Sequence, residues 1–182
     1  MLVAKQVADL LTMMRASLFL VFTWLGLAYG PQGLPAAAWL LMLSWTSDVL
    51  DGPIARRSRV QYHTWLGDHD LEVDITASVG LLVYLLESDF VNWLVGGLYV
   101  IFWVLFFWRW GIQRSPGMLF QAPIYGWFIW MSLQHATAIG IGILAWILAA
   151  IVVTWPRFPK DVVPGFLNGM RALRARRNKS TR

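Results

Sequence analysis

Six of the ten acidic residues lie between Asp48 and Asp74, in a window that contains the end of one apolar segment and the start of the next. An unpaired carboxylate near membrane depth is costly, so acids placed there pair with cations, take up protons or bind metal. Local arginines could neutralise two or three of these acids. The spacing of the acids indicates a further role.

The acids form two pairs with helical spacing. Asp48 and Asp51 are three apart at the end of one expected helix, and Asp70 and Asp74 are four apart at the start of the next. Residues three or four apart share a helix face. If the two antiparallel helices pack together, the pairs meet at one height, where four carboxylates would repel one another without a cation. The chain has no cysteine, which disfavours a site for a soft metal. The four carboxylates therefore predict one or two hard divalent ions, Mg²⁺ or Mn²⁺, and Ca²⁺ shares this preference for oxygen ligands.

The residues that follow Asp51 fit a phosphate ligand. Gly52 and Pro53 weaken a helix and let the backbone approach a ligand closely, although an ordinary helix end also explains this pair. Arg56 then lies next to the acids, where a guanidinium could hold phosphate oxygens through two parallel hydrogen bonds. The acids and the arginine together favour a diphosphate.

The run from Asp48 to Arg56, followed by Gly67, Asp70 and Asp74, resembles the signature of class I CDP-alcohol phosphatidyltransferases. That signature reads Asp, two residues, Asp-Gly, two residues, Ala-Arg, a spacer, Gly, three residues, Asp, three residues, Asp. Upstream, the segment 9–15 resembles the Asn-Leu-Thr-x-x-Arg opening of the family, with Asp in the first position.

The second half of the signature is spaced differently here. Ten residues separate Arg56 from Gly67 and two separate Gly67 from Asp70, where the family has eight and three. The loop 57–65 could absorb the extra residue and keep Asp70 and Asp74 on their helix face. The role of Gly67 stays open.

The resemblance implies a residue role at each matching position. The metal ligands are Asp48, Asp51, Asp70 and Asp74; the CDP moiety is seated by Gly52, Ala55 and Arg56; and Asp74 is also the general base. The implied reaction moves a phosphatidyl group from a CDP-linked lipid, such as CDP-diacylglycerol, to a small alcohol and releases CMP in phospholipid biosynthesis. A phosphatidylglycerophosphate synthase-like activity is one form, but Ile75 replaces the Lys of many such relatives. The resemblance also implies a homodimer.

These residues must be positioned by a membrane-embedded chain. Of the 182 residues, 58% are apolar and 14% charged, which is too apolar for a water-soluble domain of this length. We therefore expect an all-α integral membrane protein with six transmembrane helices. The expected spans are Leu10–Tyr29, Pro35–Ile54, Leu71–Leu86, Phe90–Trp110, Met118–Leu133 and Ala136–Trp155. They form a catalytic domain over residues 1–156, which a basic cytoplasmic tail, 157–182, follows.

The basic residues predict the orientation. All fifteen Lys and Arg flank the same ends of the expected helices, and such residues stay on the cytoplasmic side. Both termini and the active site are therefore expected to face the cytoplasm. We expect no nucleic-acid partner. Arg109 and Arg114 could bind a phosphate on the acceptor, or they could only mark the inner loop. The basic tail could rest on anionic headgroups or be solvated.

Two rival functions use the same carboxylates. A divalent-cation transporter would place acids or polar gaps at corresponding positions of two halves, but the last three expected helices contain no carboxylate. A membrane protein that keeps the metal site without catalysis is the other alternative, because the spacing of the second half is shifted.

Overall fold

The computed structural model describes residues 4–56, 70–155, 159–160 and 163–180, with side chains described at residues 10, 12–47, 49, 71–155, 159–160 and 163–171. The described part is helical and contains no strand. Its helices are α1 (Ala4–Tyr29), the short 3-10 helix η1 (Gly30–Gly33), α2 (Leu34–Arg56), α4 (Asp70–Glu87), α5 (Trp93–Trp110), α6 (Arg114–His135), α7 (Thr137–Val153) and α8 (Val163–Ser180). Each of the six expected spans therefore coincides with a helix. The all-α prediction is confirmed for these residues.

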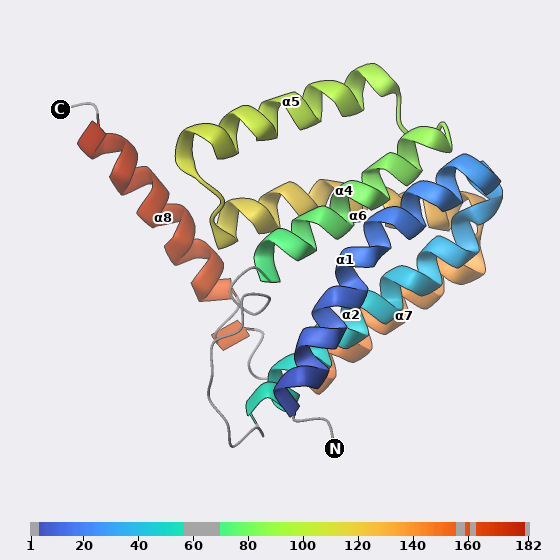
Figure 1. Cartoon of the computed structure of the whole chain (residues 1–182), viewed down its shortest axis with the longest axis horizontal. Coiled ribbons are helices and arrows are strands. Elements are labelled where there is room, and N and C mark those ends of the chain that lie inside the picture. Colours follow the sequence, from blue (N-terminus) through green and yellow to red (C-terminus); the bar gives the residue numbers. More distant parts are fainter. Residues whose placement is uncertain (1–3, 57–69, 156–158, 161–162, 181–182) are drawn as a thin grey trace.

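The first six long helices alternate in direction. The short turns between α1 and α2, α4 and α5, and α6 and α7 gather at one end of the molecule, at the upper right of Figure 1. The start of α1, the end of α2 and the starts of α4 and α6 lie toward the other end (Figure 1). The acid-bearing helix ends and the basic segments are therefore on the same side of the bundle.

The most extensive contact between helices is that of α1 with α4, which run in the same direction. A Cβ atom added to Gly80 of α4 would lie 2.5 Å from the Cα atom of Phe19, and one added to Gly26 of α1 would lie 3.2 Å from the Cα atom of Tyr84. Glycine at these two positions lets the backbones approach, as small residues do in membrane helix pairs. The two contacts fix the register between α1 and α4.

Polar contacts and aromatic rings join the other helices. The indole of Trp146 on α7 donates to the hydroxyl of Thr46 on α2 at 3.1 Å. Trp45 of α2 lies against the rings of both Trp146 and Tyr125, which is on α6. The hydroxyl of Tyr84 donates to the carbonyl of Gly30 in η1 at 3.2 Å. These contacts tie α2 to α6 and α7, and α4 to the turn after α1.

Apolar side chains cover the outside of the molecule. On α5, which lies at its edge (Figure 1), Leu94, Phe102 and Trp108 are exposed. Two stretches of the described residues, Thr12–Ser47 and Trp93–Trp110, are long and apolar enough to cross a membrane, and Thr137–Val153 is a shorter apolar helix. The first stretch includes most of α1 and α2. These features fit a membrane protein, while the six crossings stay a prediction.

The segment expected to be a basic tail contains α8. The hydroxyl of Ser115 at the start of α6 donates to the carbonyl of Phe166 at 3.1 Å, and Gly169 lies directly against Ser115. The first turns of α8 therefore pack on α6, and the helix then points away from the bundle (Figure 1).

Candidate active site

An ion pair between a buried arginine and a partly exposed aspartate joins α1 to the acid-bearing start of α4. Nη1 of Arg15 lies 2.6 Å from Oδ1 of Asp74, and the exposed fractions of the two side chains are 1% and 29%. A guanidinium is always charged, so its burial requires a nearby anion. Asp74 supplies that anion and still reaches the surface of the bundle. Nη2 of Arg15 also donates to the hydroxyl of Thr12, at 3.4 Å.

The contacts of α1 with α4 explain why Arg15 reaches Asp74. Phe19 lies against Gly80 and Gly26 lies against Tyr84, so the register along the parallel helices brings Arg15 level with the start of α4. Thr12 is one turn before Arg15 and is also buried. The pair therefore depends on side chains 59 residues apart in the sequence.

The structure places the two acid pairs on the expected helix ends. Asp48 and Asp51 lie in the last turns of α2, while Asp70 and Asp74 lie in the first two turns of α4. Helical backbone at both places puts each pair on one face. The helix α2 continues through Gly52, Pro53 and Ala55 and ends at Arg56. Among the predicted positions 48, 51, 52, 55, 56, 70 and 74, only the side chain of Asp74 belongs to the described part, and Gly67 lies outside the described residues.

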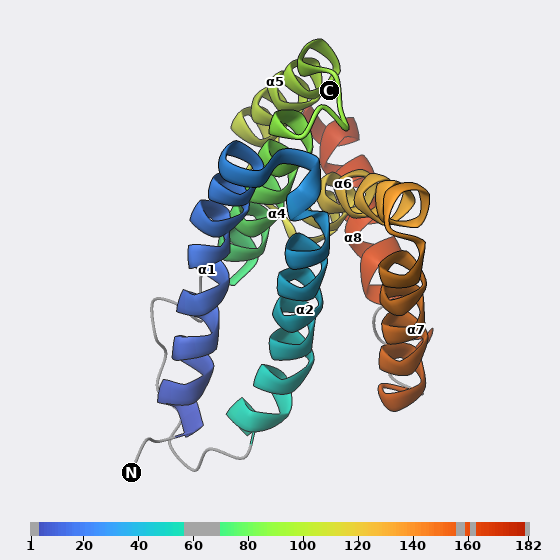
Figure 2. The same cartoon turned by 90° about the vertical axis from the view of Figure 1, so that its right-hand side faces the viewer.

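The sequence left open whether α2 packs directly against α4, and the described residues show no extensive contact between them. The helix α1 packs on both of them, most extensively on α4, and contact between α2 and α4 is marginal at most. Glycines at 26 and 80 bring α1 close to α4, whereas the turn of η1 folds α2 back along α1 (Figure 2). The helix α1 therefore links the two acid-bearing helices.

Arg114 and Arg109 occupy different settings. A Cβ atom added to Gly117 of α6 would lie 2.9 Å from Cδ1 of Leu71, so the first turn of α6, where Arg114 begins, packs beside the first turn of α4. The guanidinium of Arg109, at the end of α5, lies over the ring of Trp110 at 5.5 Å and is exposed. The fold therefore brings the start of α6 to the acid-bearing end of α4 and gives Arg109 an aromatic neighbour of its own.

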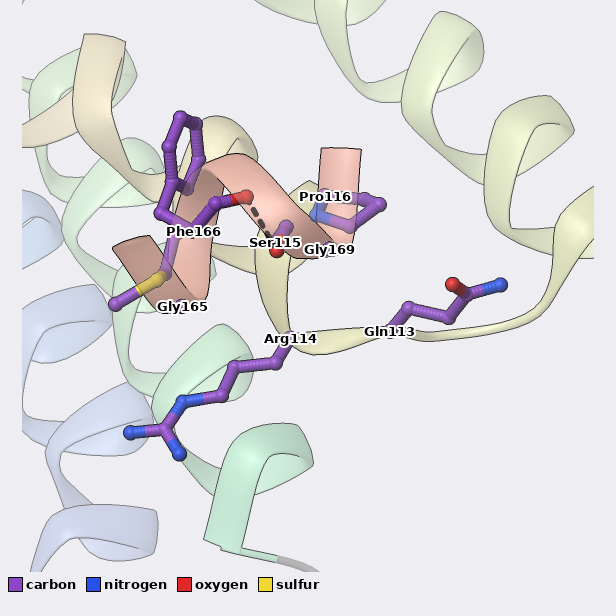
Figure 3. A pocket seen from close by; sticks show the side chains of 8 residues that line it. Gln113, Arg114, Ser115, Pro116, Gly165, Phe166 and Gly169 are labelled. Atoms are coloured by element: carbon purple, nitrogen blue, oxygen red, sulfur yellow. Dashed lines mark hydrogen bonds between the residues drawn. The ribbon is translucent and has the colours of Figure 1, made fainter. Parts of the chain in front are cut away.

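A cavity of about 320 Å³ lies between the start of α6 and α8. Gln113 to Pro116 and Met118 form one wall, and Gly165, Phe166 and Gly169 form the other. In Figure 3 Arg114 and Gln113 leave the chain in opposite directions, and the hydrogen bond from Ser115 to Phe166 holds α8 in place. The cavity is thus large enough for a small polar molecule and has a cation at its edge.

The family model for CDP-alcohol phosphatidyltransferase matches residues 5–162. The chain belongs to the CDP-alcohol phosphatidyltransferase family. The match includes both acid pairs, Arg15 and Arg114, and it ends one residue before α8. No curated protein and no solved structure matches the chain significantly.

Membership of the CDP-alcohol phosphatidyltransferase family establishes the general reaction class. These phosphotransferases use CDP-alcohol donors and alcohol acceptors, in phospholipid biosynthesis. The resemblance of the run from Asp48 to Arg56 to the family signature is therefore confirmed at the level of the family. The roles of the single residues stay predictions.

The side-chain chemistry of the four predicted aspartate ligands suits a hard divalent cation. The four aspartates offer oxygen ligands, two on one face of α2 and two on one face of α4, and Mg²⁺ and Mn²⁺ prefer oxygen. Within the described residues there is no group of three or more His, Asp or Glu that could hold a metal ion. The described ligand candidate is Asp74, whose Oδ1 accepts a hydrogen bond from Nη1 of Arg15.

Sequence reasoning did not include Arg15 and Thr12 among the site residues. Both lie in the segment 9–15 that resembles the family's opening, so the signal was present in the sequence. The segment 9–15 indicates the family, but nothing in its spacing indicates that Asp74 is the ion-pair partner of Arg15. Contacts between α1 and α4 supply that information.

Proposed function

We propose that this CDP-alcohol phosphatidyltransferase transfers a phosphatidyl group from a CDP-linked lipid, such as CDP-diacylglycerol, to a small phosphorylated alcohol and releases CMP. The acceptors that we propose are glycerol 3-phosphate, as in a phosphatidylglycerophosphate synthase-like reaction, and an inositol phosphate. The main support for this proposal is the family match over residues 5–162, which includes both acid pairs.

We further propose that Asp48, Asp51, Asp70 and Asp74 hold one or two Mg²⁺ or Mn²⁺ ions. The support is the placement of two aspartates on each of two helix ends that α1 links. When bound, such ions neutralise charge on the transferring phosphate and on the CMP leaving group.

The protein's own residues would divide the remaining work. Gly52 lets the backbone of α2 approach the CDP moiety, Ala55 adds little bulk beside it, and Arg56 binds phosphate oxygens through its planar fork. Asp74 accepts the proton of the acceptor hydroxyl as that oxygen attacks the β-phosphorus. Orientation matters for this step, since a general base must lie within hydrogen-bond reach of its proton. Oδ1 of Asp74 accepts a hydrogen bond from Arg15.

The acceptor phosphate is proposed to bind at Arg114. The start of α6 lies beside the start of α4, and a cavity is open next to it. Arg109 is a second candidate for the same phosphate, further along the chain and stacked on Trp110. Ile75 packs toward Gly117, so the position where many phosphatidylglycerophosphate synthases carry Lys takes part in helix packing here.

The proposal places the reaction at the cytoplasmic face of a six-span membrane protein, with both termini inside. This orientation is supported because the helix ends next to the basic segments lie on the same side of the bundle as the acids (Figure 1). Such a site would receive water-soluble acceptors from the cytoplasm. A homodimer is part of the same proposal, because it rests on the family resemblance.

An acceptor panel tests the proposed activity. We expect the purified protein to release CMP from CDP-diacylglycerol in the presence of Mg²⁺ or Mn²⁺ and glycerol 3-phosphate or inositol phosphate. Glycerol and inositol without the phosphate should react poorly, and EDTA should stop the reaction. CMP release would be measured with labelled CDP-diacylglycerol in detergent micelles. Equal rates with phosphorylated and unphosphorylated acceptors would contradict a phosphate site.

Replacing Arg114 by Gln should raise the KM for the phosphorylated acceptor about tenfold, since one charge-assisted hydrogen bond is lost. The KM for CDP-diacylglycerol should stay the same. Arg109→Gln is the comparison variant, because Arg109, whose guanidinium lies over Trp110, is the second candidate for the same phosphate. A larger rise in the acceptor KM for Arg109→Gln than for Arg114→Gln would assign the acceptor phosphate to Arg109 instead.

A further inference from the structure

We infer that Arg15 is a positioning residue for the transfer reaction, which it serves by holding the carboxylate of Asp74 in the orientation that the reaction needs. The inference rests on the proposed function for the role of Asp74. It adds α1 to a site that the family signature places on α2 and α4.

The burial of Arg15 is the first observation. Its side chain is 1% exposed, and one of its nitrogen atoms lies 2.6 Å from Oδ1 of Asp74. A buried guanidinium that is paired with a carboxylate is costly to disturb, because breaking the pair leaves a charge inside the protein. The geometry of this pair is therefore more constrained than that of an ion pair at the surface.

The partial exposure of Asp74 is the second observation. Its side chain is 29% exposed, while its Arg15 partner is enclosed. A carboxylate in this position has one side turned to a fixed cation and reaches the surface of the bundle. That arrangement suits a ligand or a base whose orientation must be set before the substrate arrives, since residues that hydrogen-bond to a ligating carboxylate fix its orientation.

The anchoring of Arg15 is the third observation. Nη2 donates to the hydroxyl of buried Thr12, and Phe19 lies against Gly80 one turn further along α1. The guanidinium is thus attached to the helix that packs most extensively on α4. A shift of α1 along α4 would displace Asp74 through Arg15.

Arg15→Gln tests the inference. We expect kcat for CMP release to fall about 10- to 100-fold, as for other partners of ligating groups, with an unchanged KM for CDP-diacylglycerol. Arg15→Lys should lie between Arg15→Gln and the wild type, since it keeps the charge and loses the planar fork. Each rate is expressed per folded protein, as judged by thermal unfolding in the same detergent.

The matched control is Gly140→Ala, at the start of α7. The added Cβ atom would lie 2.7 Å from the backbone nitrogen of Leu133 on α6, so this variant strains the packing of α7 on α6 and leaves the contact between α1 and α4 unchanged. At an equal loss of Tm, Gly140→Ala should retain its kcat. If it loses as much kcat as Arg15→Gln, or if Arg15→Gln keeps the wild-type kcat, Arg15 has only a structural role.

Binding of Mn²⁺ to the protein without substrate, followed by electron paramagnetic resonance, is a readout that does not need turnover. If Arg15 positions Asp74, Arg15→Gln should weaken Mn²⁺ binding about tenfold or more. If Arg15 only neutralises Asp74, its removal adds negative charge and strengthens binding, which would overturn the inference. Should Arg15→Gln fail to fold, a wild-type kcat and Mn²⁺ affinity in Arg15→Lys would overturn it as well.

The two readouts separate this inference from the proposed function. A wild-type protein that binds Mn²⁺ but releases no CMP contradicts the proposed function, while the effect of Arg15→Gln on Mn²⁺ affinity still decides the positioning role. A protein that releases CMP with the same kcat in Arg15→Gln and the wild type supports the function and refutes the inference.

Discussion

Asp74→Asn should lower the rate of CMP release from CDP-diacylglycerol by about 10²- to 10⁴-fold, the range expected when a general base is removed. An amide cannot take the proton of the acceptor hydroxyl, and it is a poorer ligand for Mg²⁺ or Mn²⁺ than a carboxylate. The rate would be measured with saturating metal and glycerol 3-phosphate, in the assay that tests the proposed activity.

The same substitution at Asp89 is the matched control. Asp89 is exposed in the turn between α4 and α5, at the other end of the bundle, and its φ of 55° is one that Asn tolerates. Asp89→Asn should keep the wild-type rate. Unchanged metal-dependent turnover in Asp74→Asn would contradict the proposed mechanism.

Stability must be followed in the Asp74→Asn experiment. The substitution replaces the carboxylate that faces the buried guanidinium of Arg15 by a neutral amide, and losing a hydrogen bond between charged groups typically costs about 1.5–3 kcal/mol. The Tm of the variant should therefore fall together with its rate. The rate per folded protein is the quantity that tests the role of Asp74.

Gly80→Ala should destabilise the protein by about 1–3 kcal/mol, the usual effect of overpacking a tight contact. The added Cβ atom would lie 2.5 Å from the Cα atom and 3.0 Å from the carbonyl oxygen of Phe19. These are backbone atoms, so a side-chain rotation cannot relieve the clash and α1 must move away from α4. Thermal unfolding in detergent would measure the loss.

Gly142→Ala on α7 is the control for Gly80→Ala. Nothing lies within 4 Å of a Cβ atom added there, and Ala is the better helix former by roughly 0.8–1.0 kcal/mol in water. We expect Gly142→Ala to unfold at the wild-type temperature or above it. Equal Tm values for the two variants would contradict this prediction, because they would show that the contact between α1 and α4 tolerates a Cβ atom at position 80.

The match between helices and expected spans has a local cause. Apolar runs of about 20 residues, separated by Gly, Pro and polar turns, predict helices because each helix satisfies its own backbone hydrogen bonds. The starts and ends differ by a few residues: α5 begins at Trp93, where the side chain of Asn92 caps the helix by accepting from the Leu94 N–H at 2.8 Å. Single caps of this kind are weak signals among neighbouring polar residues.

The sequence by itself determined the helices, the family signature and the pairing of acids on two helix faces, because each of these depends on residues a few positions apart. Only the tertiary structure decided that Arg15 is the partner of Asp74 and that α1 lies between the acid-bearing helices. Those outcomes depend on which small residues allow two backbones to approach, here Gly26 and Gly80. Helical periodicity says which face a residue occupies, but the choice of neighbouring helix is made by packing over the whole bundle.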